Sequence, residues 1–207
     1  MKDGINLRLS MIFLQISAPF ASFKHSYSRE YGDTYSLPTP ATIYGCLLSL
    51  VGETNLQVHR GVKLAIALLS EPQVATVLRT VRRMKSKDIN ARENSRPDYQ
   101  SILCGLDIVV GIDSTQESGN LEARVRQALL HPDTIDRFGG WSLGESRDLI
   151  DDVRILPNLP SAARWLVKDD RGRYNLPLVV DYLGSKETQK QKFCLGDFCE
   201  EAFCVIP

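Results

Sequence analysis

The most polarised part of the sequence is a basic segment that runs from Arg79 to Arg96. It holds seven basic side chains against two acidic ones, a local balance of +5 in a chain whose formal net charge is zero. Because each phosphate that a cation neutralises releases condensed counterions, such a segment is typical of a surface that binds a nucleic-acid backbone. The alternative is a solvated charged loop. The candidate contacts are Arg79, Arg82, Arg83, Lys85, Lys87, Arg92 and Arg96.

A second candidate is the glycine-rich stretch RFGGWSLGESRDLIDD, residues 137–152. Glycine permits close approach of another backbone, an indole can stack on a base, and a guanidinium can bind a phosphate. The stretch lacks the GK[ST] of a P-loop and the GxGxxG of a dinucleotide-binding turn, so a simple turn is the alternative. The residues expected to contact RNA are Gly139, Gly140, Trp141, Ser142 and Arg147.

The third candidate is the loop SAPFASFKHSYSREYGDTY, residues 17–35, in which aromatic rings are interleaved with cations. Each base that stacks on an aromatic ring contributes roughly 1 to 3 kcal/mol to single-strand binding, so the composition favours an RNA contact. The alternative is that half of these rings pack against the core. The loop leads to a helix N-terminus, which attracts anions. The expected contacts are Ser17, Phe20, Ser22, Phe23, Lys24, His25, Tyr27, Arg29, Thr42 and Tyr44.

Hydrophobic periodicity and capping residues predict the elements that position these stretches. Thr39 is the expected N-cap of a helix that Pro40 begins and Gly52 follows. Strands are expected within residues 5–17, 61–70, 101–113 and 151–156, and helices within 39–51 and 118–132. This order predicts an α+β fold of the ferredoxin-like, RRM-like class.

The connection between the second and third strands is too long for a simple turn, so an inserted β-hairpin arm is expected at about residues 71–100. The fold would then divide into residues 1–160 and a small β-rich C-terminal portion, 161–207, packed on the first part. Within that portion we expect a hairpin over 163–183, turning near Gly172, and a last strand within 190–207.

Composition restricts the remaining possibilities. The 207 residues are 43% hydrophobic, which is enough for one substantial core or two modest ones. No signal peptide and no apolar stretch of about 20 residues is seen, so a cytoplasmic protein is expected. The five cysteines form no CxxC pair, and the five-residue spacing is not typical of zinc sites. We therefore expect free, buried thiols at Cys194, Cys199 and Cys204, and neither a metal nor a cofactor.

Three features in this order resemble the RAMP proteins of CRISPR systems: SAPFASF after a first strand, PTPATIYGCLLSLVGE opening a helix, and FGGWSLGESRDL after a second helix. Together with the basic arm they are most similar to the fifth-numbered Cas family, over most of residues 5–155. The loops resemble its Myxan, or DevS-like, branch of type I-B systems.

The resemblance implies a RAMP palm whose thumb is the basic arm. It implies a non-catalytic subunit of type I Cascade that caps the 5′ handle of CRISPR RNA and contacts a backbone RAMP subunit and the large subunit near target DNA, in prokaryotic antiviral defence. One alternative is a metal-independent endoribonuclease that processes repeat RNA, for which His25, Lys24 and Tyr44 are the candidate catalytic residues. The other is a protein-only adaptor whose arm meets an acidic partner.

Overall fold

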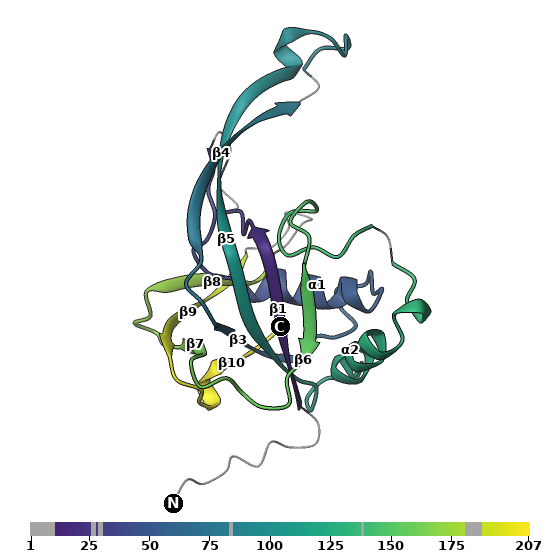
Figure 1. Cartoon of the computed structure of the whole chain (residues 1–207), viewed down its shortest axis with the longest axis vertical. Helices are drawn as coiled ribbons and strands as arrows, with labels where there is room; N and C mark the ends of the chain where they lie inside the picture. The colour runs from purple at the N-terminus through teal and green to yellow at the C-terminus, as the bar shows by residue number, and fades with distance from the viewer. Residues whose placement is uncertain (1–10, 26–27, 29–30, 83–84, 138, 181–187) are drawn as a thin grey trace, which may run out of the picture.

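The computed structural model describes residues 11–25, 28, 31–82, 85–137, 139–180 and 188–207, without the side chains of Val81 and Arg82. The chain forms a mainly antiparallel sheet with two α-helices packed on one of its faces. A long hairpin projects from the sheet (Figure 1). The predicted α+β class is confirmed.

Four strands form the centre of the sheet, in the order β6 (Asp152–Ile155), β1 (Met11–Ala21), β5 (Ser95–Asp113) and β3 (Lys63–Leu68). The predicted strand and helix order is confirmed. β1 extends beyond the expected end, through Pro19 to Ala21. Pro19 has no partner in the β1–β5 register, and β6 stops pairing at Ser17, so the missing N–H costs no ladder bond.

The first helix begins at the residue that the sequence predicts, and the second lies within its expected range, 118–132. In α1 (Pro40–Leu50), the side chain of Thr39 accepts the N–H of Thr42, and the helix is followed by Gly52 with φ of 66°. In α2 (Leu121–Leu130), Asn120 caps the first turn by accepting the N–H of Ala123. The apolar faces of both helices pack against side chains of β1, β3 and β5 in the main core.

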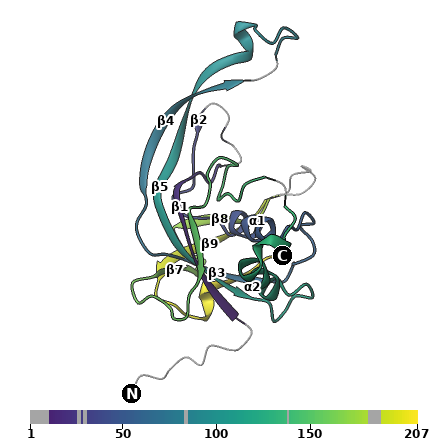
Figure 2. The same ribbon diagram turned by 45° about the vertical axis from the view of Figure 1, so that its right-hand side comes forward.

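The arm, residues 73–104, consists of β4 (Gln73–Arg82) and the first half of β5, which pair antiparallel over ten residues. A short 3-10 helix, Arg92–Asn94, lies at its tip, and β2 (Tyr31–Gly32) pairs in parallel with β5 near its base. The predicted hairpin is confirmed. β5 runs for 19 residues from the arm into the centre of the sheet, so the arm continues a core strand (Figure 2).

The C-terminal strands extend the sheet beyond β3, through β7 (Arg164–Lys168), β9 (Gln189–Gly196) and β8 (Tyr174–Val179), while β10 (Phe203–Val205) also pairs with β3. The predicted hairpin of β7 with β8 is wrong, because β9 lies between them and pairs with both. The predicted turn is present, and a Cβ on Gly172 would lie 2.5 Å from the carbonyl of Phe193. The boundary at residue 160 stays a prediction.

Apolar side chains fill both faces of the sheet. The helices cover one face, and on the other Phe13, Trp165 and Phe198 pack edge to face or tilted. All five cysteines are free thiols, but Cys194 and Cys199 are only half-buried. Burial raises the pKa of Cys204 to about 12. Within the described residues, no cluster of three His, Cys, Asp or Glu side chains is placed to hold a metal, and no helix is long and apolar enough to span a membrane.

Candidate nucleic-acid interface

One buried side chain organises the tip of the arm. Asn94 is 4% exposed, and its Oδ1 accepts the backbone N–H groups of Lys85 and Ser86 at 2.7 and 2.8 Å. Its Nδ2 donates to the carbonyls of Ser86 and Asp88 at 3.1 and 2.6 Å. These four bonds link both sides of the tip, so the backbone of residues 85–94 is held in one conformation.

The cations around Asn94 point to solvent. Lys85, Lys87 and Arg92 are exposed, and none of them lies within 4 Å of a described carboxylate. The tip therefore presents three cationic side chains on a fixed backbone, together with the exposed carboxylates of Asp88 and Glu93. Such an arrangement can hold phosphates without first breaking an ion pair or ordering a loop. Arg83 lies outside the described residues, as does the side chain of Arg82.

The base of the arm uses its cations differently. Arg79 Nη1 lies 3.1 Å from a carboxylate oxygen of Glu145, and Arg147 Nη2 lies 2.9 Å from the same oxygen. The amide of Gln100 donates to the other Glu145 oxygen and accepts from Arg147. Glu145, which the sequence analysis did not single out, thus ties the glycine-rich loop to the arm. Arg96 Nη2 lies 4.0 Å from a carboxylate oxygen of Asp98. Contacts of Arg79, Arg96 and Arg147 with RNA stay predictions.

The glycine-rich loop also packs against the end of β1. Gly144 has φ of 113°, and a Cβ there would lie 2.5 Å from the carbonyl oxygen of Ser22, so only glycine fits. Trp141 donates its indole N–H to the carbonyl of Cys46 in α1 at 3.0 Å. Asp148 accepts the N–H of Glu145, and burial raises the pKa of its carboxyl group. The three candidate stretches therefore meet at the base of the arm.

Other residues of the glycine-rich loop remain available to a ligand. Gly139 and Gly140 are exposed, and Ser142, which bridges to Leu149 through its backbone, is half-buried. A Cβ on Gly139 would meet nothing within 4 Å. Their contacts with RNA stay predictions.

Burial corrects part of the prediction for the opening loop and the first helix. Phe23 is 2% exposed and Tyr44 is 5% exposed, so neither ring offers a surface to a base. The hydroxyl of Tyr44 donates to the carbonyl of Leu56, and burial raises the pKa of Tyr44 to about 12. Ser22 is buried as well, whereas Phe20, at 50%, and Lys24 are exposed.

The remaining predicted residues have different environments. The hydroxyl of Thr42 lies 2.8 Å from that of Thr39 at the helix cap, and Ser17 is half-buried in β1. Tyr27 and Arg29 lie outside the described residues. Contacts by Ser17 and Thr42 with RNA stay predictions.

His25 is half-buried between an aromatic ring and a carboxylate. Its ring centroid lies 3.7 Å from that of Tyr35, and Nε2 lies 4.0 Å from Asp33. Burial lowers the pKa of His25, and the nearby charge of Lys190 lowers it further, while Asp33 opposes the shift. The imidazole is therefore neutral near pH 7.

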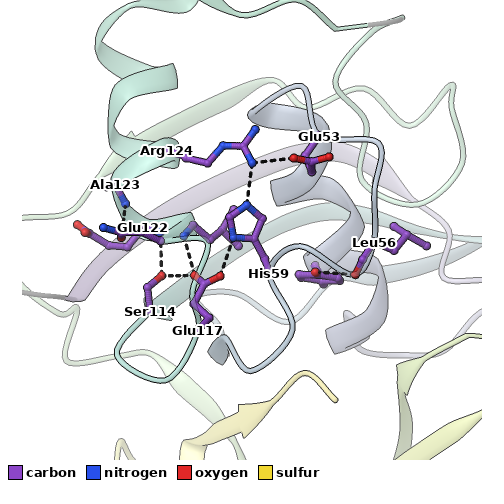
Figure 3. A network of polar contacts seen from close by, with 11 residues as sticks. Glu53, Leu56, His59, Ser114, Glu117, Glu122, Ala123 and Arg124 are labelled. Atoms are coloured by element: carbon purple, nitrogen blue, oxygen red, sulfur yellow. Dashed lines mark hydrogen bonds and ion pairs between the residues drawn. The ribbon is translucent and has the colours of Figure 1, made fainter.

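Figure 3 shows a polar cluster beside the end of α1 and the start of α2, which we call the clasp: Glu53, His59, Ser114, Glu117 and Arg124. His59 Nδ1 lies 2.6 Å from Glu117 Oε2, and both side chains are 0% exposed. Arg124 Nη1 lies 2.8 Å from His59 Nε2 and donates to it, because a guanidinium has no acceptor. The proton of His59 is therefore on Nδ1, and the ring is neutral and inaccessible.

Glu117 is the centre of the clasp. Its Oε1 accepts from the hydroxyl of Ser114 at 2.5 Å and from the N–H of Leu121 at 2.6 Å. Arg124 also donates to Glu53 at 2.8 Å, which lowers the pKa of that carboxyl group. The clasp thus joins the ends of both helices, and the charge of Arg124 is paired with Glu53 within it.

Known proteins match both the sequence and the fold. A sequence model of the family described as CRISPR-associated protein (Cas_Cas5) matches residues 11–154. The chain is 41% identical over 186 residues to the CRISPR-associated protein Cas5 of Myxococcus xanthus (strain DK1622), covering 86% of this chain and 87% of that protein.

Two solved structures share the fold. A chain of a CRISPR RNA-guided surveillance complex has a TM-score of 0.66 at 14% identity, with 90% of this chain and 89% of that chain covered. A structure described as a Cas protein has a TM-score of 0.55 at 12% identity, with 95% of each chain covered. From the family match and the identity to the curated protein, the chain belongs to the Cas5 family of CRISPR-associated proteins.

Proposed function

We propose that this chain is the subunit of a type I CRISPR effector complex that binds and caps the 5′ handle of CRISPR RNA. It would also anchor a backbone RAMP subunit and the large subunit for RNA-guided DNA targeting. Family membership supports this role, as does the similarity of the fold to a chain of an RNA-guided surveillance complex.

In this proposal the palm is a ferredoxin-like RAMP domain and the arm is its thumb. The strand order β6-β1-β5-β3, with α1 and α2 on one face, supports the ferredoxin-like assignment. The arm leaves this sheet as a continuation of β5, so a ligand held at its tip is positioned relative to the palm.

The observation that carries the proposal is the tip itself. Three exposed cations, Lys85, Lys87 and Arg92, surround a loop that Asn94 holds in place. Their side chains are not committed to described carboxylates, in contrast to those of Arg79 and Arg147 at the base of the arm. Phosphates are the ligands that such a surface selects.

The same geometry favours a binding role over RNA cleavage. Metal-independent cleavage needs an acid and a base on opposite sides of the reacting phosphate. Of the three histidines of the chain, His131 lies at the C-terminal end of α2 and belongs to none of the three candidate stretches. His59 is inaccessible in the clasp, and Tyr44, the expected partner of His25, points its hydroxyl to Leu56. Without that tyrosine, the proposed catalytic set is reduced to His25 and Lys24.

The test is the affinity of the purified chain for handle RNA between 50 and 200 mM salt, measured by fluorescence anisotropy. Log affinity should fall with log salt by roughly 0.7 for each phosphate contact. The triple reversal Lys85→Glu, Lys87→Glu, Arg92→Glu should weaken binding on the order of 100-fold or more at low salt, because three attractive contacts become repulsive. Arg60→Glu, Arg164→Glu, Arg171→Glu is the matched control at exposed sites outside the arm.

Three results would contradict the proposal. Equal losses for the two triple variants would show that the tip has no special role. Affinity that hardly changes with salt would favour a protein-only adaptor. Specific cleavage within the repeat, retained in EDTA, would establish a nuclease.

A further inference from the structure

The two faces of the arm differ in chemistry. Directly opposed residues of an antiparallel pair share a face, and alternate residues point to opposite faces. One face therefore carries Arg79, Asp98 and Gln100, which point toward Glu145 or Arg96. The other face carries no charged residue between positions 74 and 80 of β4 or at the opposed positions of β5. We call it the apolar arm face: Val74, Thr76, Leu78, Thr80, Pro97, Tyr99, Ser101 and Leu103.

Three large apolar side chains on this face are open to solvent, whereas Leu103 is buried in the core. Val74 is 63% exposed, Leu78 is 62% exposed and Tyr99 is 55% exposed. Tyr31 adjoins them, 44% exposed, with its hydroxyl 2.7 Å from that of Ser101. Exposed apolar side chains gathered on one face of a projecting element are typical of an interaction surface.

The edge of β4 supplies the second observation. Among the described residues, β4 pairs with β5 alone, so its other edge has no backbone partner in the sheet. The strand is ten residues long, has no proline and pairs without a register shift. Proteins protect long edge strands with prolines, bulges or charges, because an open edge invites another strand. In β4 the one charged side chain before Arg82 belongs to Arg79, and Glu145 neutralises it.

We propose that the apolar arm face and the open edge of β4 bind an extended segment of a neighbouring protein subunit. The segment adds a strand to β4, and its alternate apolar side chains cover Val74 and Leu78. An RNA strand is a poor occupant, since none of the eight residues of the apolar arm face carries a cation to meet its phosphates. The identity of the neighbour, a subunit of the same effector complex, rests on the function proposed above.

Co-expression of the tagged chain with the backbone subunit, the large subunit and repeat RNA tests this inference. Leu78→Glu should reduce the co-purified protein subunits at least 10-fold, because a charge is buried against the added strand. Leu130→Glu is the matched control: Leu130 is 63% exposed at the end of α2, away from the arm. The isolated Leu78→Glu chain should keep its handle-RNA affinity within about twofold. If circular dichroism shows that the Leu78→Glu chain is unfolded, Val74→Glu is the variant to use in its place.

Hydrogen exchange measures the strand addition directly. In the assembled complex, amides of β4 should exchange at least 10-fold more slowly than in the isolated chain. Unchanged exchange in β4 would overturn the proposal, as would equal assembly of the Leu78→Glu and Leu130→Glu chains. Loss of RNA affinity in isolated Leu78→Glu would show that bases cover the face. A dimer of the isolated chain that Leu78→Glu abolishes would show a second copy there. If the handle-binding role itself were wrong, the triple variant of the tip would lose no more RNA affinity than its matched control.

Discussion

Two buried polar side chains, Glu117 in the clasp and Asn94 at the tip of the arm, both hold backbone segments together, but their surroundings differ. Each has oxygen acceptors that hold backbone N–H groups, and each joins segments that are separate in sequence. Glu117 is a carboxyl group, and the side chains around it, His59 and Arg124, are hydrogen-bonded within the clasp. Asn94 is neutral, and the cations around it point outward.

The difference shows how to interpret a basic side chain in this molecule. Arg124 in the clasp and Arg79 at the base of the arm are committed to Glu53 and Glu145, so their charges serve the fold. At the tip, where the central group is a neutral amide, Lys85, Lys87 and Arg92 form no ion pair with a described carboxylate. Whether a basic side chain can bind a ligand therefore depends on whether a carboxylate within the fold already pairs with it, and not on how many cations lie nearby.

Replacing Glu117 should produce the largest effect on stability. Glu117→Ala leaves the Nδ1–H of His59, the hydroxyl of Ser114 and the N–H of Leu121 without an acceptor in a buried site. Each buried donor left without an acceptor costs about 1 to 3 kcal/mol in the free energy of unfolding, so the three together cost several kcal/mol. Urea denaturation measures the change, and handle-RNA affinity per folded molecule should be unaltered.

Glu93→Ala, at an exposed position of the arm tip, is the control for removing one carboxylate. It should change the free energy of unfolding by less than about 0.5 kcal/mol. If Glu117→Ala also stays within that range, the clasp does not hold the helices together.

Replacing Asn94 should give the opposite result, a smaller effect that falls on binding. Asn94→Ala removes four hydrogen bonds that fix residues 85–94, but the backbone groups released at the tip can bind water. The free energy of unfolding should fall by about 1 kcal/mol, in the range of a lost cap. Handle-RNA affinity should fall about 10-fold, because ordering the tip then opposes binding.

Asn90→Ala is the matched control, since Asn90 is exposed and lies in the same tip. Anisotropy and urea denaturation should show wild-type values for it. An Asn94→Ala chain with unchanged affinity would mean that the tip does not need a fixed backbone to bind RNA.

The sequence predicted the elements well where local signals are strong. Thr39 and Asn120 are caps whose side chains act within one turn, and both helices begin after them. The pairing of β7 and β8 was wrong because the sequence between them has a good turn, and turn chemistry does not exclude a third strand. β9 separates them through contacts that are remote in sequence, such as Phe193 with Lys168 and Tyr174.

The site was harder to predict, for a physical reason. Residue type indicates what Phe23, Tyr44 or Arg79 can bind, whereas burial and ion pairs decide whether each is available, and both depend on the tertiary fold. Glu145 gave no signal, because a single carboxylate in a glycine-rich loop has no distinctive spacing. The cations at the tip were expected to be exposed, and they are, because a long hairpin has little core in which to bury a side chain.

The smallest expected effect concerns pH and His25, which lies near neither buried centre. Burial lowers the pKa of His25, so below about pH 6.5 the unfolded chain binds a proton that the folded chain does not. Stability should therefore fall as the pH drops from 7.5 to 5.5, and His25→Gln should reduce that fall, measured as urea midpoints at both pH values. At pH 7.5 the neutral ring offers no charge to a phosphate, so His25→Gln should keep handle-RNA affinity within about twofold. A large loss of affinity at pH 7.5 would instead place His25 in the RNA contact, because the variant then removes an interaction that does not depend on charge.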